Sequence, residues 1–152
     1  MKPTHVINSA REAWLSRIAT TGLAVSNDPA PADVPSVSEA LRSVANWEVQ
    51  PTATISLSDP DPLQEVDQQW HNLADLNGLF ESDGSFLLSI SESGASSLGW
   101  AVVKWSPGAQ LAPRLARPGE GLDFLAMSRD GKVVCAVTEE EYDYWIVVQH
   151  LR

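Results

Sequence analysis

The C-terminal half of this chain of 152 residues contains one sequence pattern twice, and this repeat constrains the fold more than any other feature. Each copy starts with an Asp-Gly pair, at Asp83 and again at Asp130, continues as an apolar segment, and enters a second apolar segment at Trp100 or Trp145. Glycine accepts positive φ and aspartate bonds its own backbone, so each pair predicts a turn. The apolar residues that alternate after each turn predict strands. The repeat therefore predicts two similar β-hairpins.

The repeat resembles the blades of β-propellers of the WD-repeat type, in which an Asp-Gly turn precedes one strand and a tryptophan opens a later one. The resemblance extends from Asp83 to Trp105 and from Asp130 to Val148. A propeller needs about four blades or more to close, so two units in a chain of this length exclude a complete one. We instead expect paired hairpins that are covered on one face by helices.

Residues 82–152 are predicted to form a mainly antiparallel sheet of about five strands, because most of the connections are short. A long loop with three prolines is expected over residues 107–121. The predicted strands lie near residues 86–91, 98–105, 122–127, 132–138 and 144–150.

Residues 1–80 are predicted to be mainly helical. The segments Ser9–Glu12 and Ser36–Glu39 both match the capping box, in which a serine and a glutamate bond the backbone at the start of a helix. Asp61 followed by Pro62 predicts a third helix, since aspartate can cap and proline suits the first helical position. Three helices are therefore expected before the sheet.

The proline-rich segment 26–35 predicts a connector between the first two helices, because proline cannot continue a helix. Residues 52–57 predict an additional strand. The helical spacing of apolar residues predicts which side chains of the second and third helices point inward: Val37, Ala40, Leu41 and Val44, then Leu63, Val66, Trp70, Leu73 and Leu76.

These patterns together predict an α+β fold, with N-terminal helices packed on a C-terminal antiparallel sheet of about five strands built from two similar hairpins. The length fits a single domain over residues 1–152, and 43% hydrophobic residues favour a packed core. Cys135 is alone and lies in an apolar strand, so we expect a small buried hydrophobe. Neither a targeting segment nor an apolar run of membrane-spanning length is recognised, and the expected location is cytoplasmic.

The net charge of −10 is concentrated in the middle of the chain. Residues 51–100 contain eight acidic and no basic side chains, so this third carries −8. The electric field of this negative charge repels nucleic acid and anionic membranes and attracts a basic partner. A surface that serves only solubility explains the same composition, and both interpretations stay open.

The acidic residues supply the candidate partner-binding positions. In the middle third these are Asp61, Glu65, Asp67, Asp75, Glu81 and Asp83. A second patch lies in the last predicted hairpin loop: Glu139, Glu140, Glu141, Tyr142 and Asp143. This second patch fits an anionic rim with aromatic anchors, and it equally fits a charged loop that discourages strand-to-strand association.

No catalytic motif is present, and three histidines with one cysteine leave few groups for acid-base or nucleophilic chemistry. We therefore expect no enzyme, no catalytic residues, no cofactor and no metal site. Three residues that can bind a metal ion, Asp67, His71 and Asp75, are spaced four apart along one face of the predicted helix. This row lacks ligands from a second element, so a solvated face explains it better than a metal site.

The sequence thus favours a non-catalytic acidic binding protein, most of all an immunity or inhibitor protein that neutralises a basic toxin, with a nuclease as one candidate. The alternative is an acidic secretion chaperone or adaptor that binds an extended segment of a partner along a sheet edge. A weaker third hypothesis is a metal-dependent hydrolase that uses the row of Asp67, His71 and Asp75. The partner is expected to be a basic protein, a toxin or a secreted effector, and neither nucleic acid nor a membrane.

Overall fold

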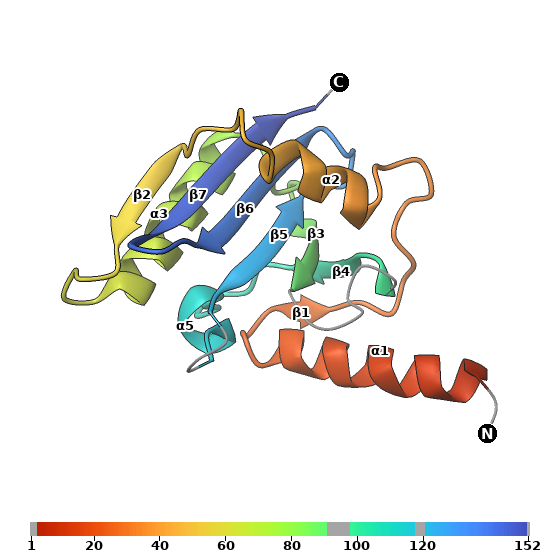
Figure 1. The fold of residues 1–152 in the computed structure, drawn as a ribbon. Helices are drawn as coiled ribbons and strands as arrows, with labels where there is room; N and C mark the ends of the chain where they lie inside the picture. The colour runs from red at the N-terminus through yellow and green to blue at the C-terminus, as the bar shows by residue number, and fades with distance from the viewer. Residues whose placement is uncertain (1–2, 91–97, 118–120, 152) are drawn as a thin grey trace.

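A computed structural model describes residues 3–90, 98–117 and 121–151 of the chain (Figure 1). Within these residues, seven strands form one sheet in the order β1-β4-β3-β5-β6-β7-β2, and all neighbours are antiparallel. The strands are β1 (Ala24–Val25), β2 (Ala53–Ser56), β3 (Ser85–Ile90), β4 (Ala101–Lys104), β5 (Asp123–Met127), β6 (Val133–Glu139) and β7 (Asp143–His150). The described helices are α1 (Pro3–Ala19), α2 (Val37–Val44), α3 (Pro62–Leu76) and α5 (Ala112–Leu115).

The predicted α+β class is confirmed, and the strand predicted over residues 52–57 is present as β2, but the described sheet has seven strands and not about five. Two strands from the N-terminal half extend the sheet at its edges, since β1 pairs with β4 and β2 pairs with β7. The description of the sheet as two similar hairpins is not confirmed either. The pairs β3–β4 and β6–β7 are each antiparallel, but β5 lies between them, and the connection between β3 and β4 includes residues outside the described ones.

The two Asp-Gly pairs form turns of the same kind, as their chemistry predicts. Gly84 and Gly131 adopt φ of 87° and 76°. The carboxylate of Asp83 accepts a hydrogen bond of 2.9 Å from the backbone N–H of Ser85. Asp130 accepts one of 3.0 Å from the N–H of Lys132. Each aspartate thus bonds the residue two positions later, which fixes the chain as it enters the next strand.

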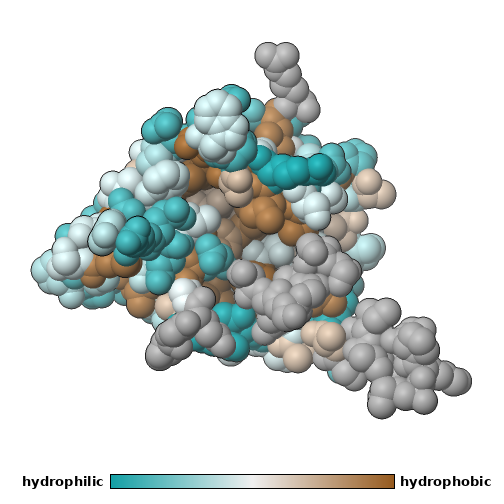
Figure 2. Space-filling model, viewed as in Figure 1, coloured by the Kyte–Doolittle hydropathy of each residue, from teal (hydrophilic) through white to brown (hydrophobic). Residues whose placement is uncertain are grey.

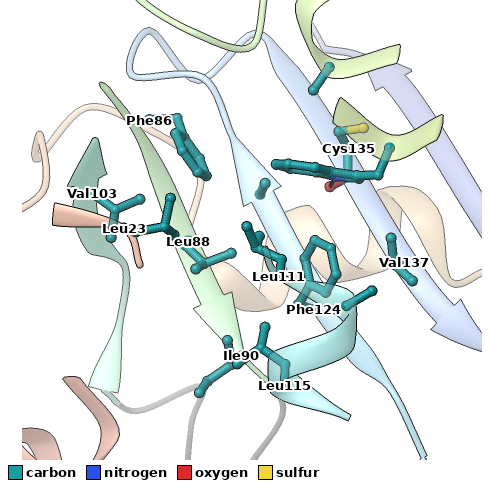
Figure 3. Packing of buried hydrophobic residues seen from close by; sticks show 14 of the residues in the cluster. Leu23, Phe86, Leu88, Ile90, Val103, Leu111, Leu115, Phe124, Cys135 and Val137 are labelled. Atoms are coloured by element: carbon teal, nitrogen blue, oxygen red, sulfur yellow. Dashed lines mark hydrogen bonds between the residues drawn. The ribbon is translucent and has the colours of Figure 1, made fainter. Parts of the chain in front are cut away.

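Apolar residues cover both faces of the sheet. On one face, the strands pack against α1, α3 and α5 through residues such as Trp14, Trp70 and Phe86. Figure 3 shows this core, in which Leu111 and Leu115 of the α5 region approach Phe124 and side chains of β3. We call this the helical face.

The other face, which we call the α2 face, carries a second apolar cluster that includes Leu87, Val102 and Met127. It is covered by α2 and by Val34 of the proline-rich connector. Figure 2 views the molecule from this side and shows apolar side chains in its middle with polar ones around them. The expectation of helices on one face only was therefore wrong, because neither face of these strands is polar enough to meet water.

The start of α2 is built as the sequence predicts, and the start of α1 is not. The hydroxyl of Ser36 accepts from the N–H of Glu39, and the carboxylate of Glu39 accepts from the N–H of Ser36, which completes the capping box. In contrast, α1 begins at Pro3, so the segment Ser9–Glu12 lies inside the helix and does not start it.

Other local predictions failed where tertiary packing decides the outcome. Leu41 and Leu76 were expected inside, but they are 48% and 81% exposed because neither faces the sheet. Asp61 stands at the N-cap of α3 with Pro62 after it, yet its side chain makes no capping hydrogen bond. The predicted loop over 107–121 contains the helix α5.

The connector between α1 and α2 is fixed to the sheet at Pro35. The indole N–H of Trp100 donates to the carbonyl oxygen of Pro35 at 2.9 Å. Gly131, in the second Asp-Gly turn, is buried beneath the same segment, and a Cβ on it would lie 2.7 Å from Cδ of Pro35 and 3.2 Å from Val34. Here glycine is required both for its positive φ and for the close approach of the two segments.

Replacing Gly131 by alanine should therefore lower the free energy of unfolding by about 3 kcal/mol, from the strained φ together with the clash with Pro35. Gly84→Ala is the matched control, since its φ is similar but its nearest neighbour, Trp105, is 3.5 Å away. We expect a loss of about 1 kcal/mol there. Urea unfolding of the three proteins measures both losses, and equal losses would show that the contact with Pro35 has no effect.

Candidate binding surface at the acidic end of the sheet

The β6–β7 hairpin presents a cluster of carboxylates at one end of the sheet. Its loop is closed by a hydrogen bond of 2.8 Å from the N–H of Glu140 to the carbonyl oxygen of Asp143. Glu139, Glu140 and Glu141 are exposed, and Tyr142 at the tip is 76% exposed. The five residues predicted as the second patch therefore do lie together on one loop, with a large aromatic side chain in water.

Two further segments reach the same end of the sheet. Asp143 pairs with Ser56 at the end of β2, and the carbonyl oxygen of Tyr142 accepts from the N–H of Leu57 at 3.0 Å. The loop that follows, with exposed Asp59 and Asp61, therefore starts beside the hairpin (Figure 1). On the β6 side of the hairpin, β5 begins at the same end of the sheet with Asp123, which lies opposite Thr138. We call this set the acidic end: Asp59, Asp61, Asp123, Glu139, Glu140, Glu141, Tyr142 and Asp143.

Asp123 is the acidic-end residue whose ionisation is most affected by its neighbours. It lies at the start of β5, opposite Thr138. Partial desolvation of the carboxylate, followed by the charges of Glu140 and Glu139, raises the pKa of Asp123 from 3.8 to about 6. The Glu139 N–H, which hydrogen-bonds this carboxylate, acts in the opposite direction. Loss of hydration is therefore the main reason for the raised pKa, and repulsion by the two neighbouring carboxylates adds to it.

A basic residue stands at the border of this surface. Arg117 forms an isolated bridge with Gly121, and a Cβ on Gly121 would lie 3.7 Å from the carboxylate of Glu139. The acidic end is thus a cluster of carboxylates with Arg117 at its border.

The other predicted acidic residues lie elsewhere. Glu81 and Asp83 belong to the first Asp-Gly turn, at the opposite end of the sheet, and both are exposed. A hydrogen bond from Ser85 lowers the pKa of Asp83, and the nearby charges of Lys104 and Arg129 lower it further. That end therefore has mixed charge and is a weaker attractor for a basic partner.

The two remaining exposed acids of the prediction lie along α3. Glu65 accepts a hydrogen bond of 2.7 Å from the side chain of Gln69 on the same helix. Asp75 is exposed near the helix C-terminus. The N–H of Glu65 donates to the carbonyl oxygen of Asp61 at 3.1 Å, so Glu65 lies one turn from the acidic end, whereas Asp75 lies at the other end of the helix.

Asp67 has a structural position that the sequence did not indicate. Only 8% of its surface is exposed, and one carboxylate oxygen accepts from the N–H groups of Leu111 and Ala112 at 2.8 and 3.1 Å. These N–H groups are at the start of α5, so Asp67 fastens α5 to α3. Desolvation raises the pKa of Asp67 despite these hydrogen bonds. A buried carboxylate with two donors is not part of a surface for a partner.

The row of Asp67, His71 and Asp75 is also divided by its surroundings. His71 is half-buried, with its ring centroid 4.4 Å from that of Trp105 and 5.3 Å from that of Phe80. Asp67 turns inward to α5, while Asp75 remains in water. Over the described part of the chain, no group of three or more histidine, cysteine or acidic side chains is arranged to hold a metal ion.

The aromatic residues after the hairpin loop point to different faces. Tyr144 is buried in the core of the helical face, whereas Trp145 is half-buried against the α2 face. Desolvation raises the pKa of Tyr144, with further contributions from the charge of Glu139 and a hydrogen bond to it. Tyr142 is thus the aromatic side chain of this loop that a partner can reach.

Comparison with known proteins identified no relative, since no protein-family model, curated protein or solved structure matches the chain. In the described residues, no helix has the length and apolar character needed to cross a membrane.

Replacing Asp67 by alanine should lower the free energy of unfolding by about 2–4 kcal/mol, because the N–H groups of Leu111 and Ala112 lose their acceptor. Asp67→Asn keeps an acceptor oxygen and removes the buried charge, so we expect a change within about 1 kcal/mol. Denaturant unfolding at neutral pH compares the two. Equal losses would show that these hydrogen bonds do not hold α5 in place.

Asp123→Asn should make the protein more stable at pH 7. The folded-state pKa of Asp123 is about 6, above the ordinary value of 3.8, so the folded protein binds a proton at this carboxylate more tightly than the unfolded chain does. The stability that this protonation gives is present below pH 3.8 and is lost as the pH rises from 3.8 to about 6. Because the residue is largely exposed, screening by water limits the gain at pH 7 to about 1 kcal/mol. Melting temperatures from pH 4 to pH 7 measure this, and parallel profiles for both proteins would contradict the raised pKa.

Proposed function

We propose that this protein is a non-catalytic binding protein that inhibits a basic protein partner by docking its acidic end against a positively charged surface. The observation that carries the proposal is the convergence of three acidic segments, around Asp61, Asp123 and Glu140, on one end of the sheet beside exposed Tyr142. Carboxylates steer a basic partner during encounter, and a central aromatic residue supplies a desolvated anchor.

An immunity protein fits this proposal best. A toxin that acts on nucleic acid needs a basic active site for phosphate, and a cluster of carboxylates can occupy such a site in place of the substrate. The surroundings of Asp123 support this reading, because its partly desolvated carboxylate lies near the like charges of Glu140 and Glu139, and a cation bound there would offset their repulsion. We propose the cytoplasm as the compartment, where the single buried Cys135 needs no oxidising environment.

The groups that an enzyme would use are poorly disposed for chemistry, which supports a non-catalytic role. Burial raises the pKa of the Cys135 thiol to about 12, so it is not a nucleophile near neutral pH. His71 lies between aromatic rings, and the ring of His150 hydrogen-bonds the side chain of Asn77 at 3.0 Å.

Neutralising the hairpin tests the proposal. In the variant Glu139→Gln/Glu140→Gln/Glu141→Gln, capture of the partner from a lysate of the native host at low salt should fall roughly tenfold, because the steering charges are lost. Asp75→Asn/Glu81→Gln/Asp83→Asn removes the same number of charges away from the acidic end and should capture as much as the original protein. High salt should weaken capture by the original protein.

Two results would contradict the proposal. One is equal loss of capture in both triple variants, which would assign binding to the overall charge and not to the acidic end. The other is capture by the original protein that does not respond to salt. Purified partner recovered at low salt then allows the second half of the proposal to be measured, as inhibition of the partner's own activity by the original protein and by each variant.

A further inference from the structure

The outer edge of β2 is an open strand edge to which the function proposed above assigns no role. β2 is the last strand in the sheet order, and it pairs with β7 along one side only. In Figure 1 it lies at the outer border of the sheet. The opposite edge strand, β1, has only two residues and is too short to receive a partner strand.

The hydrogen-bonding groups of β2 can be assigned from its register. The N–H of Leu57 donates to Tyr142 of the hairpin, so Leu57 and the residues that alternate with it direct their backbone groups toward β7. The N–H groups of Thr54 and Ser56 consequently point away from the sheet, together with the carbonyl oxygen of Thr54. The side chains of both residues are exposed, so nothing on them closes this edge.

Two of the devices that usually protect an edge strand from pairing are absent from β2. No lysine and no proline occurs within β2, and each protects an edge strand when present. Acidic residues lie at both ends instead: exposed Glu48 precedes the strand, and exposed Asp59 and Asp61 follow it. A segment added to β2 would therefore run between Glu48 at one end and Asp59 and Asp61 at the other, with Tyr142 near the second end.

We propose that the outer edge of β2 receives an extended, basic segment of the partner as an eighth strand of the sheet. This inference rests on the function proposed above and specifies how the partner is held: backbone pairing with Thr54 and Ser56 for alignment, and the neighbouring carboxylates for charge. Charge selects this occupant over a second copy of the chain, because two molecules of net charge −10 would place like charges together at both ends of the shared edge.

The experiment uses a decapeptide of alternating lysine and valine as the probe. A decapeptide of alternating lysine and proline carries the same charge but cannot pair as a strand, and it serves as the control peptide. We expect the first to bind and the second to bind at least about tenfold more weakly. On binding, the amide protons of Thr54 and Ser56 should become protected from hydrogen exchange in the unaltered protein.

A matched pair of variants completes the test. Thr54→Pro removes an N–H that makes no bond within the sheet, so the fold should survive, while binding of the lysine-valine peptide should fall at least about tenfold. Thr54→Val keeps the N–H and should bind within about twofold of the original protein. If Thr54→Pro does not fold, the exchange measurement on the unaltered protein decides alone.

The outcomes separate this inference from the proposed function. If the hairpin variant Glu139→Gln/Glu140→Gln/Glu141→Gln weakens peptide binding while Thr54→Pro does not, the acidic end binds and the strand pairing is overturned. If Thr54→Pro weakens binding while the hairpin variant does not, the strand pairing stands and the electrostatic proposal is overturned. Binding of both peptides with equal affinity, pairing of β2 with a second copy, or no protection at Thr54 and Ser56 overturns the inference.

Discussion

The structure depends on a sheet that is apolar on both of its faces. All six residues of β3 are buried, and so are the first five of β6. An antiparallel sheet commonly leaves one face to water, which requires polar residues at alternate positions. These strands do not have them, so burial of both faces is what the rest of the chain has to provide.

The N-terminal half meets this requirement by passing around the sheet. It contributes α1 to the helical face, β1 to one edge, α2 to the α2 face, β2 to the other edge, and α3 to the helical face again. The proline-rich connector makes the passage from one face to the other. Its contact with Gly131 and its hydrogen bond to Trp100 are consequences of that route. With both faces covered, the charged residues are left to the ends of the sheet, which explains how the acids of distant segments come together.

Sequence patterns identified the elements whose cause is local. The capping box at Ser36, the turn chemistry of Asp83 and Asp130, and the apolar segments of the C-terminal strands each act within a few residues, and each predicted element is present in the structure. The two edge strands had weaker signals, since β1 has only two residues and depends on β4 for its conformation.

At the candidate site, the failures involve partners that are distant in sequence. Asp67 could be read as a surface acid until α5 was placed against it. Asp123 carried no signal of its own, because its importance comes from the register that sets β5 beside β6 and so brings it near Glu139. Composition showed that the chain is acidic, but only the register of the strands shows which acids are neighbours.

The pairing of β2 with β7 also affects the order in which the protein is completed. Ala53 lies opposite Ile146, which follows it by 93 residues, whereas β5, β6 and β7 pair with strands close to them in the chain. During synthesis, β2 therefore leaves the ribosome long before β7, its partner strand in the described sheet, exists. Throughout that interval both of its edges are open, so this short segment can pair with other chains until β7 covers one edge.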